Sequence, residues 1–390
     1  MVSGVRDLGD GIGMMLLGDV GRGGSPINDW LDEDLIIDYF EIPMAQRQMP
    51  DRDLIKFTSI YFPRTMERLL ELYDMIVICE EEELFTRFTT TKMQKLMYDS
   101  IQSEGVALFN SLPHEDHEFI AWARNMMGEL VPHEYSSGYV NLFGGFRISI
   151  SEMDLPPIFT PFKNLGLEKY TGPRLGQIHP RQGSVEWATV APFNTPFYVS
   201  WEVGDAEARV SVVANDLDEP WWGSTYRGDP STNPYGGDLF LNMVYWSVGM
   251  KPLTNIAIVH NVRVSFGDYL LRRAVTLSLI EFIDAFGATI GELEEDLNIV
   301  TEGRSEVRSL YFEQRYEEAL VILDEMEARM TAIEDRAIEL KERAFLWIYL
   351  VEWLAVTGTM MVVGFLTWSL MIRRKLYREV SITRATGDTL

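Results

Sequence analysis

Cysteine is almost absent from this chain, which has a single thiol, Cys79, among its 390 residues. One thiol excludes an intrachain disulfide framework, and it also excludes a cysteine-based zinc site. Basic residues are scarce as well, since 34 Lys and Arg stand against 59 Asp and Glu, for a net charge of −25. This excess of negative charge argues against nucleic acid and anionic lipid as partners of the main body of the chain.

Long hydrophobic runs are rare in this sequence, but one is present at residues 353–372, WLAVTGTMMVVGFLTWSLMI, which contain no charge. Twenty apolar residues at helical rise match the hydrocarbon thickness of a bilayer. Trp347, Trp353 and Trp368 lie near the two ends, where indole rings favour the membrane interface. We therefore predict a transmembrane helix over 346–372, the alternative being a buried helix of a soluble domain.

The side of the membrane on which the main domain lies depends on conflicting signals. Basic residues at 373–375, 378 and 384 favour a cytoplasmic tail over 373–390 and an extracytoplasmic main domain. The N-terminal segment, however, has no basic n-region and no apolar run of signal-peptide length. The sequence also contains no Asn-x-Ser/Thr acceptor for N-glycosylation, which favours a main domain on the cytoplasmic side. We expect a single-pass protein with its main domain outside, and a tail-anchored protein facing inward remains the alternative.

Residues 12–250 alternate between short apolar runs and amphipathic helical segments. This order predicts an α/β fold with a parallel sheet and helices on both faces, joined by right-handed crossovers. The predicted strands of the first part are 14–19, 35–42, 75–79 and 106–109, and its predicted helices are 65–73 and 89–103. From 139 the pattern turns toward β structure, with strands expected at 146–150, 185–190, 197–203 and 209–213, before a helix at 238–248.

From about residue 267 the chain is predicted to be helical to its end, and residues 260–345 read as a helical stalk. Apolar residues spaced alternately by four and three predict a heptad seam: Ala319, Leu323, Met326, Met330, Ile333, Ala337 and Leu340. The seam fits either a hairpin packed on residues 267–313 or self-association with a protein partner. The piece at 309–320 also looks like half of a tetratricopeptide unit, and no repeat follows it.

Several segments of 12–250 together resemble the class I glutamine amidotransferase-like fold, in its trehalose-utilisation (ThuA-like) branch. They are MMLLGD, ELYDMIVIC, FTTTKMQKLMYDSIQSEGVALFNS, VSWEVGDAEARVSVVANDL and GGDLFLNMVYWSVG. The resemblance implies a nucleophilic cysteine on the turn after the strand 106–109, at the end of the third segment, and a histidine where the strand of the fourth segment ends. Here those positions hold Asn110 and Ser111, and Asn215 and Asp216. Without a thiolate and its base, glutamine hydrolysis is not expected.

The same edge of the predicted sheet carries other polar candidates. Cys79 ends a predicted central strand, but the four glutamates that follow would raise its pKa, which favours a buried structural thiol. Ser111 would need a base, and His114 and His117 lie nearby in sequence, where they could also hold a divalent metal. A solvated helix N-terminus explains the two histidines more simply. His179 is expected to lie in a loop, and no cofactor is expected.

The segment 215–235 combines amides, carboxylates and aromatic rings. Asn215 and Asp216 precede Trp221 and Trp222, and Tyr226 follows in a loop rich in Gly, Pro and Ser. Exposed rings beside polar groups are typical of sugar binding, whereas two tryptophans in the core would make the loop a surface connection.

Three functions fit these features. The first is a membrane-anchored, non-catalytic amidotransferase-like domain, a pseudoenzyme that binds a small polar ligand or a protein partner. The second is a hydrolase-like enzyme acting on carbohydrate or another polar molecule. The third is a structural subunit of a membrane or surface complex, assembled through the stalk.

Overall fold

The computed structural model describes residues 11–18, 27–43, 50–79, 89–111, 126–141, 147–152, 154–167, 174–191, 193–215, 217, 220–222, 233–287 and 290–387. The chain divides into two compact units. The α/β unit comprises Met1–Asp268 and Ser305–Leu323, and the helical unit comprises Tyr269–Arg304 and Asp324–Leu390.

An eight-stranded sheet forms the centre of the α/β unit, in the order β2-β1-β3-β4-β10-β9-β8-β6. The first five strands in this order pair in parallel, and the last three continue the sheet in antiparallel fashion. The parallel strands are β1 (Ile12–Gly18), β2 (Ile37–Pro43), β3 (Met75–Cys79), β4 (Ala107–Ser111) and β10 (Ala208–Val213). The others are β6 (Arg147–Ile150), β8 (Val185–Ala191) and β9 (Thr195–Val203), while β5 (His133–Asn141) and β7 (Arg174–Pro180) form a separate antiparallel pair.

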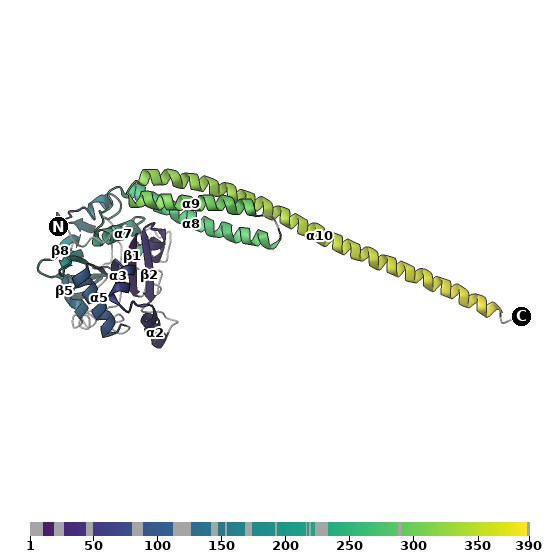
Figure 1. Ribbon diagram of the computed structural model, residues 1–390, viewed down its shortest axis with the longest axis horizontal. Coiled ribbons are helices and arrows are strands. Elements are labelled where there is room, and N and C mark those ends of the chain that lie inside the picture. Colours follow the sequence, from purple (N-terminus) through teal and green to yellow (C-terminus); the bar gives the residue numbers. More distant parts are fainter. Residues whose placement is uncertain are drawn as a thin grey trace. The chain divides into compact units, whose positions relative to one another are not determined.

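One face of the sheet is covered by α2 (Asp51–Tyr61), α3 (Met66–Leu72), α5 (Thr91–Glu104) and the short helix η1 (Met126–Glu129) (Figure 1). Met15, Ile76 and Leu108 from the strands share one buried cluster with Leu69 of α3 and Met97 of α5. The helix α5 begins where Thr90 accepts a hydrogen bond from the Met93 N–H, and it ends at Gly105, whose φ of 80° is left-handed. The helix thus has a threonine cap at its start and a glycine at its end.

The opposite face of the sheet carries α1 (Ile27–Glu33) and α7 (Gly236–Ser247). Every residue of α7 is buried. Phe240 of α7 makes ring contacts with Phe109 of β4, at 5.5 Å between centroids, and with Trp30 of α1, also at 5.5 Å. Because apolar side chains leave the strands on both faces, both need helical cover. The predicted α/β fold, with its parallel strands and a helix layer on each face, is confirmed.

Three helices contribute to the helical unit: α8 (Ile256–Ala285), α9 (Gly291–Phe312) and α10 (Tyr316–Gly387). Within this unit, the Arg272 guanidinium of α8 donates to both Glu334 carboxylate oxygens of α10, at 2.9 and 2.7 Å. Arg336 of α10 pairs with Glu292 of α9. The heptad residues Met326, Met330, Ile333 and Ala337 are all buried. The seam is thus covered inside the chain's own helices, as in the hairpin alternative.

The unit boundaries differ from the predicted division of the chain at residue 260. Residues 260–268 of α8 and Ser305–Leu323 belong to the α/β unit, although both fall in the predicted stalk. Their side chains explain this assignment, because Arg263 and Tyr311 bind buried groups of the α/β unit. Helical periodicity alone does not show where a helix leaves one packed body and joins another.

Candidate functional site

The carboxyl edge of the five parallel strands is the place where open α/β sheets bind ligands. Their order, β2-β1-β3-β4-β10, puts the switch in strand order between β1 and β3. Gly18 and Cys79 are in register at this point. A Cβ on Gly18 would lie 2.1 Å from the Cys79 carbonyl oxygen, so only glycine allows the two backbones to approach this closely.

Register brings three of the predicted site residues to this edge. Asn110 pairs with Ile78 of β3 and with Val212 of β10, and Ser111 pairs with Val213. Asn215 lies just after β10, two residues beyond its last residue, Val213. All three predicted site residues are buried, so the edge presents amide and hydroxyl groups that are already packed.

The two tryptophans that follow this edge belong to the core, which is the second of the two alternatives given above, and they form no exposed stacking surface. Trp221 is 0% exposed and Trp222 is 1% exposed. Trp222 stacks on Phe197 with an interplanar angle of 9°, and its indole N–H donates to the Asn215 amide oxygen. A buried indole needs an acceptor for its N–H, and Asn215 supplies it. Asp216 and Tyr226 lie outside the described residues.

The remaining sequence candidates give no reaction centre in the described part of the chain. Cys79 is buried at the end of β3. His114 and His117 lie outside the described residues, and the described residues contain no group of three His, Cys, Asp or Glu that could hold a metal. His179, expected in a loop, lies on β7, because this stretch pairs with β5.

A buried polar network on α1, α7, α8 and α9 was not predicted. The Asp34 carboxylate accepts hydrogen bonds from the Tyr245 hydroxyl at 2.5 Å and from the Tyr311 hydroxyl at 3.2 Å. It also accepts the N–H groups of Ile36 and Ile37, at the start of β2. The two tyrosine oxygens lie 3.1 Å apart. This carboxylate therefore holds together segments that are far apart in the sequence.

Arg263 supplies the positive charge of the network. Its guanidinium donates to the Asp238 carboxylate at 2.6 Å and to the Trp30 carbonyl oxygen at 3.1 Å, and it pairs with Asp34 at 3.8 Å. His260 Nδ1 lies 2.7 Å from the other Asp238 oxygen. Burial lowers the pKa of Arg263, but the carboxylates of Asp238 and Asp34 outweigh this, so the net pKa is raised and the guanidinium stays charged.

Burial also raises the pKa of both tyrosines well above the usual range, and the negative charge of Asp34 adds to this effect. The hydroxyls of Tyr245 and Tyr311 thus remain protonated donors. The carboxylates of Asp34 and Asp238 are bound by the two tyrosine hydroxyls and by the Arg263 guanidinium, and all these side chains are buried. The network is therefore a structural clamp between segments that are distant in the sequence.

Two further buried groups have shifted pKa values. Burial, helped by the nearby Arg181, lowers the pKa of His133 at the start of β5 to about 3. Burial raises the pKa of Tyr198 to about 12, against the opposing hydrogen bonds of Ser211 and Ser247. Both side chains are neutral at pH 7, as expected for ionisable groups enclosed by protein.

No family model matches the chain, and no curated protein sequence matches it. A solved structure, the cytoplasmic protein STM3548 from Salmonella typhimurium, is 15% identical to it, with a TM-score of 0.45. The match covers 60% of this chain and 99% of that chain.

Proposed function

We propose that this protein is a membrane-anchored α/β domain of the amidotransferase-like kind that binds a ligand or a partner without catalysing a reaction. The observation that supports it most directly is the exposed apolar segment 353–372 of α10. In the described residues, α10 is the one helix that is long and apolar enough to cross a membrane, and its apolar window is 0% buried. Met360 is 73% exposed and Phe365 is 65% exposed.

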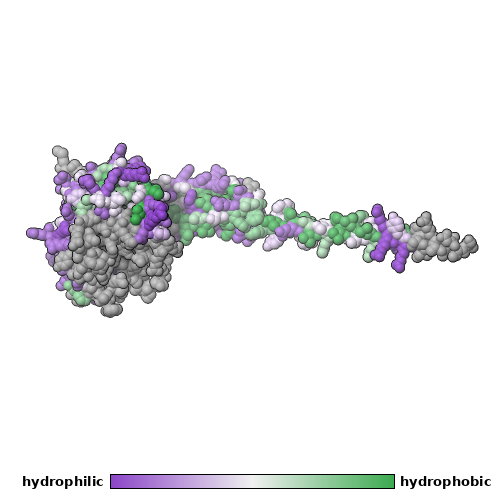
Figure 2. All heavy atoms as spheres, turned by 90° about the horizontal axis from the view of Figure 1, so that it is seen from below, coloured by the Kyte–Doolittle hydropathy of each residue, from purple (hydrophilic) through white to green (hydrophobic). Residues whose placement is uncertain are grey.

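The exposure of this segment is unfavourable in water. Burying apolar surface is worth about 25 cal/mol per Å², and the face of this helix seen in Figure 2 is mostly green, with paler patches between the green ones. Twenty residues at about 1.5 Å each span about 30 Å, the thickness of the hydrocarbon core. A bilayer covers such a surface without any further protein.

The threonine hydroxyls inside the segment are satisfied within the helix itself. The hydroxyls of Thr357, Thr359 and Thr367 donate to the carbonyl oxygens four residues earlier, at 2.7, 2.7 and 2.8 Å. Lipid offers no hydrogen-bond partners, so a spanning helix must satisfy such groups internally. These bonds are compatible with a helix surrounded by acyl chains.

The absence of catalysis is supported by the carboxyl edge of the sheet. Among the described residues, the polar side chains at this edge are the buried Asn110, Ser111, Asn215 and Cys79. The Asn215 amide oxygen already accepts a hydrogen bond from the Trp222 indole N–H. A serine or cysteine nucleophile needs an adjacent base and access to substrate. In this proposal the α/β unit keeps the fold and has lost the chemistry.

We extend the proposal to topology. Arg373, Arg374 and Lys375 follow the apolar segment directly, which favours a cytoplasmic C-terminal tail by the positive-inside rule. The α/β unit then lies on the other side of the membrane.

The proposal is tested by expressing the full chain and separating membranes from soluble protein. We expect the chain in the membrane pellet after alkaline carbonate washing and in the supernatant after detergent. Protease added to intact cells or sealed vesicles then reports which side carries the α/β unit. Recovery of the intact chain in the soluble fraction without detergent would refute the anchor. Amide hydrolysis by the purified chain that Ser111→Ala or Cys79→Ala abolishes would refute the lack of catalysis.

A further inference from the structure

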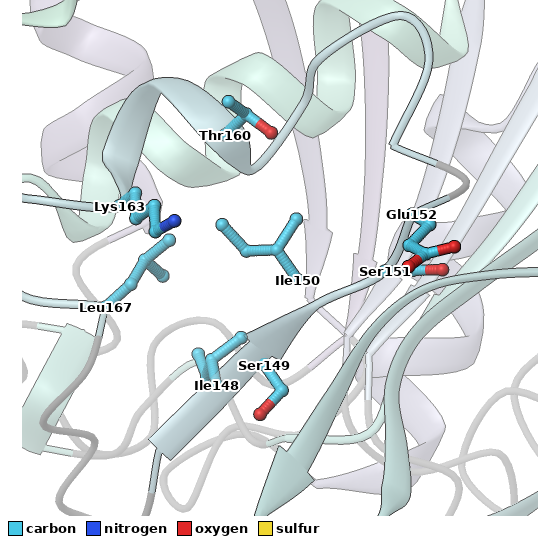
Figure 3. A pocket seen from close by; sticks show the side chains of 8 residues that line it. All are labelled: Ile148, Ser149, Ile150, Ser151, Glu152, Thr160, Lys163 and Leu167. Atoms are coloured by element: carbon cyan, nitrogen blue, oxygen red, sulfur yellow. The ribbon is translucent and has the colours of Figure 1, made fainter.

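A pocket of about 360 Å³ lies beside β6, the last strand of the sheet (Figure 3). Its volume is within the range of small-molecule sites. Four strand spacings of about 4.8 Å, roughly 19 Å in all, separate β6 from β4. The pocket is therefore distinct from the carboxyl edge described above.

The wall of the pocket is apolar at its centre. Ile148 and Leu167 are buried and Ile150 is half-buried, and all three side chains line the pocket. In Figure 3, Ile150 stands in the middle, with Leu167 and Lys163 on one side of it and Glu152 on the other. This surface favours a ligand with an apolar portion.

The backbone of β6 adds hydrogen-bonding groups to this wall. The Ile148 N–H donates to the Leu167 carbonyl oxygen at 3.4 Å, on the side away from β8. The Ser151 N–H donates to the Trp187 carbonyl oxygen at 2.9 Å, on the side of β8. Successive residues of a strand alternate in the direction of their backbone groups. The N–H and C=O of Ile150 therefore face the same side as those of Ile148, toward the segment that closes the pocket.

Two opposite charges lie at the pocket, and neither is used elsewhere in the described part of the chain. Lys163 and Glu152 both line it, and neither forms an ion pair with any residue that the structure describes. A lysine ammonium attracts a carboxylate, and a glutamate attracts an ammonium. The two charges thus match a ligand that carries both.

The turn that carries Lys163 is held in place by the buried Asp154. Its carboxylate accepts the N–H groups of Ile158 at 2.8 Å and of Thr160 at 2.7 Å, and also the Thr160 hydroxyl at 2.7 Å. A binding site that is ordered before its ligand arrives loses less entropy on binding. The backbone of the turn from which Lys163 projects is therefore ordered by the fold.

We infer that this pocket binds a small zwitterion, an α-amino acid with an apolar side chain. Its carboxylate pairs with Lys163, its ammonium pairs with Glu152, and its side chain lies on Ile148, Ile150 and Leu167. This inference gives a ligand class to the proposed binding role, on which it rests, but it does not require the membrane anchor.

The test uses the full chain in detergent micelles and measures binding by isothermal titration calorimetry. The probes are L-leucine, 4-methylpentanoate, which lacks the amine, and 3-methylbutylamine, which lacks the carboxylate. We expect leucine to bind at least tenfold more tightly than either single-charge analogue, about 1.4 kcal/mol. Lys163→Met and Glu152→Gln should each weaken leucine binding at least tenfold, whereas the exposed-lysine control Lys95→Met should leave it unchanged.

The analogues separate the two charge contacts. Lys163→Met should leave 3-methylbutylamine binding unchanged, and Glu152→Gln should leave 4-methylpentanoate binding unchanged. The inference is overturned if leucine shows no heat of binding up to about 10 mM, or if the analogues bind as tightly as leucine. It is also overturned if extended peptides bind and free leucine does not. Membrane fractionation of the same variants should not change, so failure here is distinguishable from failure of the anchor.

Discussion

Two helical segments of this protein, α7 and residues 353–372 of α10, have similar apolar character and opposite surroundings. Every residue of α7 is enclosed by the sheet, by α1 and by its other neighbours in the α/β unit. None of the apolar window of α10 is enclosed by the described protein. The difference shows that the hydrophobicity of a helix indicates only that it must be covered. Its length and its polar residues indicate whether protein or lipid covers it.

The polar residues within the two helices support this distinction. The helix α7 contains Asp238 and Asn242, and both have specific partners: Asp238 binds Arg263, and the Asn242 amide donates to the Ile158 carbonyl oxygen at 2.8 Å. Residues 353–372 contain hydroxyls that bond to their own helix and no ionisable group. Protein cover can match a charge on a helix, whereas lipid cannot.

The largest expected effect comes from placing charge in the α10 segment. Val362→Arg together with Val363→Arg should move the chain out of the carbonate-washed membrane pellet. Each central arginine opposes insertion by about 2.5 to 3.5 kcal/mol. Quantitative immunoblotting of the fractions measures the result. Two arginines at the exposed bundle positions Glu325 and Asp335 should leave the distribution unchanged, and a double Val→Arg chain that stays in the membrane would contradict the comparison.

Removing the charge that fixes α7 should have the next largest effect. Arg263→Met leaves the carboxylates of Asp34 and Asp238 buried without their cation, which costs about 3 to 5 kcal/mol of stability. Urea unfolding of the detergent-solubilised chain, followed by tryptophan fluorescence, measures it. Arg68→Met, at an exposed pair with Glu71, is the control and should not move the midpoint. An unchanged midpoint for Arg263→Met would show that the network is not structural.

The same substitution in both helices compares their surroundings directly. Leu241→Ala in α7 should cost about 2 to 5 kcal/mol of stability, because Leu241 is 0% exposed and a cavity would remain. Leu366→Ala in α10, where Leu366 is 55% exposed, should leave the unfolding midpoint of the α/β unit unchanged. Comparable losses at the two positions would mean that protein covers both helices.

Acid should separate the two regions as well, with the smallest effect for each pH unit. The folded-state pKa of His133 is about 3 against 6.5 for the free side chain, so between these values the unfolded chain binds a proton that the native chain does not. Stability should therefore fall as pH falls from 6.5 toward 3, by at most about 1.4 kcal/mol per pH unit from this group. Urea titrations at several pH values measure the slope.

Histidine variants isolate that contribution. His133→Gln should reduce the dependence of stability on pH, whereas His179→Gln, at an exposed position, should not. Membrane association should be insensitive to the same acid titration, because residues 353–372 contain no ionisable group. If His133→Gln left the dependence of stability on pH unchanged, the buried, neutral histidine would not be the source of that dependence.

Much of the sheet could be predicted because buried parallel strands are continuous apolar runs. The strand predicted at 75–79 is β3 without a shift, and β1 and β4 differ from the predictions by one or two residues at their ends. The helix α2 escaped prediction because only Leu54 and Thr58 of its residues are buried, too few to mark a face. The pair β5 and β7 escaped because β5, HEYSSGYVN, is polar and does not alternate.

The candidate site could be predicted in part for a similar reason. Parallel strands end at one edge, so Asn110, Ser111 and Asn215 were expected together and lie together. The burial of Trp221 and Trp222 could not be read from composition, since the same residues suit a core or a stacking surface. The clamp joins Asp34 to Tyr245 and Tyr311, which lie 211 and 277 positions further along the chain. A single sequence gives no signal for contacts at such separations.

Tyr311 has a consequence for how this protein is made. The α/β unit requires Ser305–Leu323 for its last hydrogen bonds, so a polypeptide cut after Asp268 leaves Asp34 without one of its two phenolic donors. During synthesis, those residues leave the ribosome only shortly before residues 353–372 do. In the proposed membrane-anchored protein, the completion of the α/β unit and its delivery to the bilayer therefore fall in the same brief interval of translation.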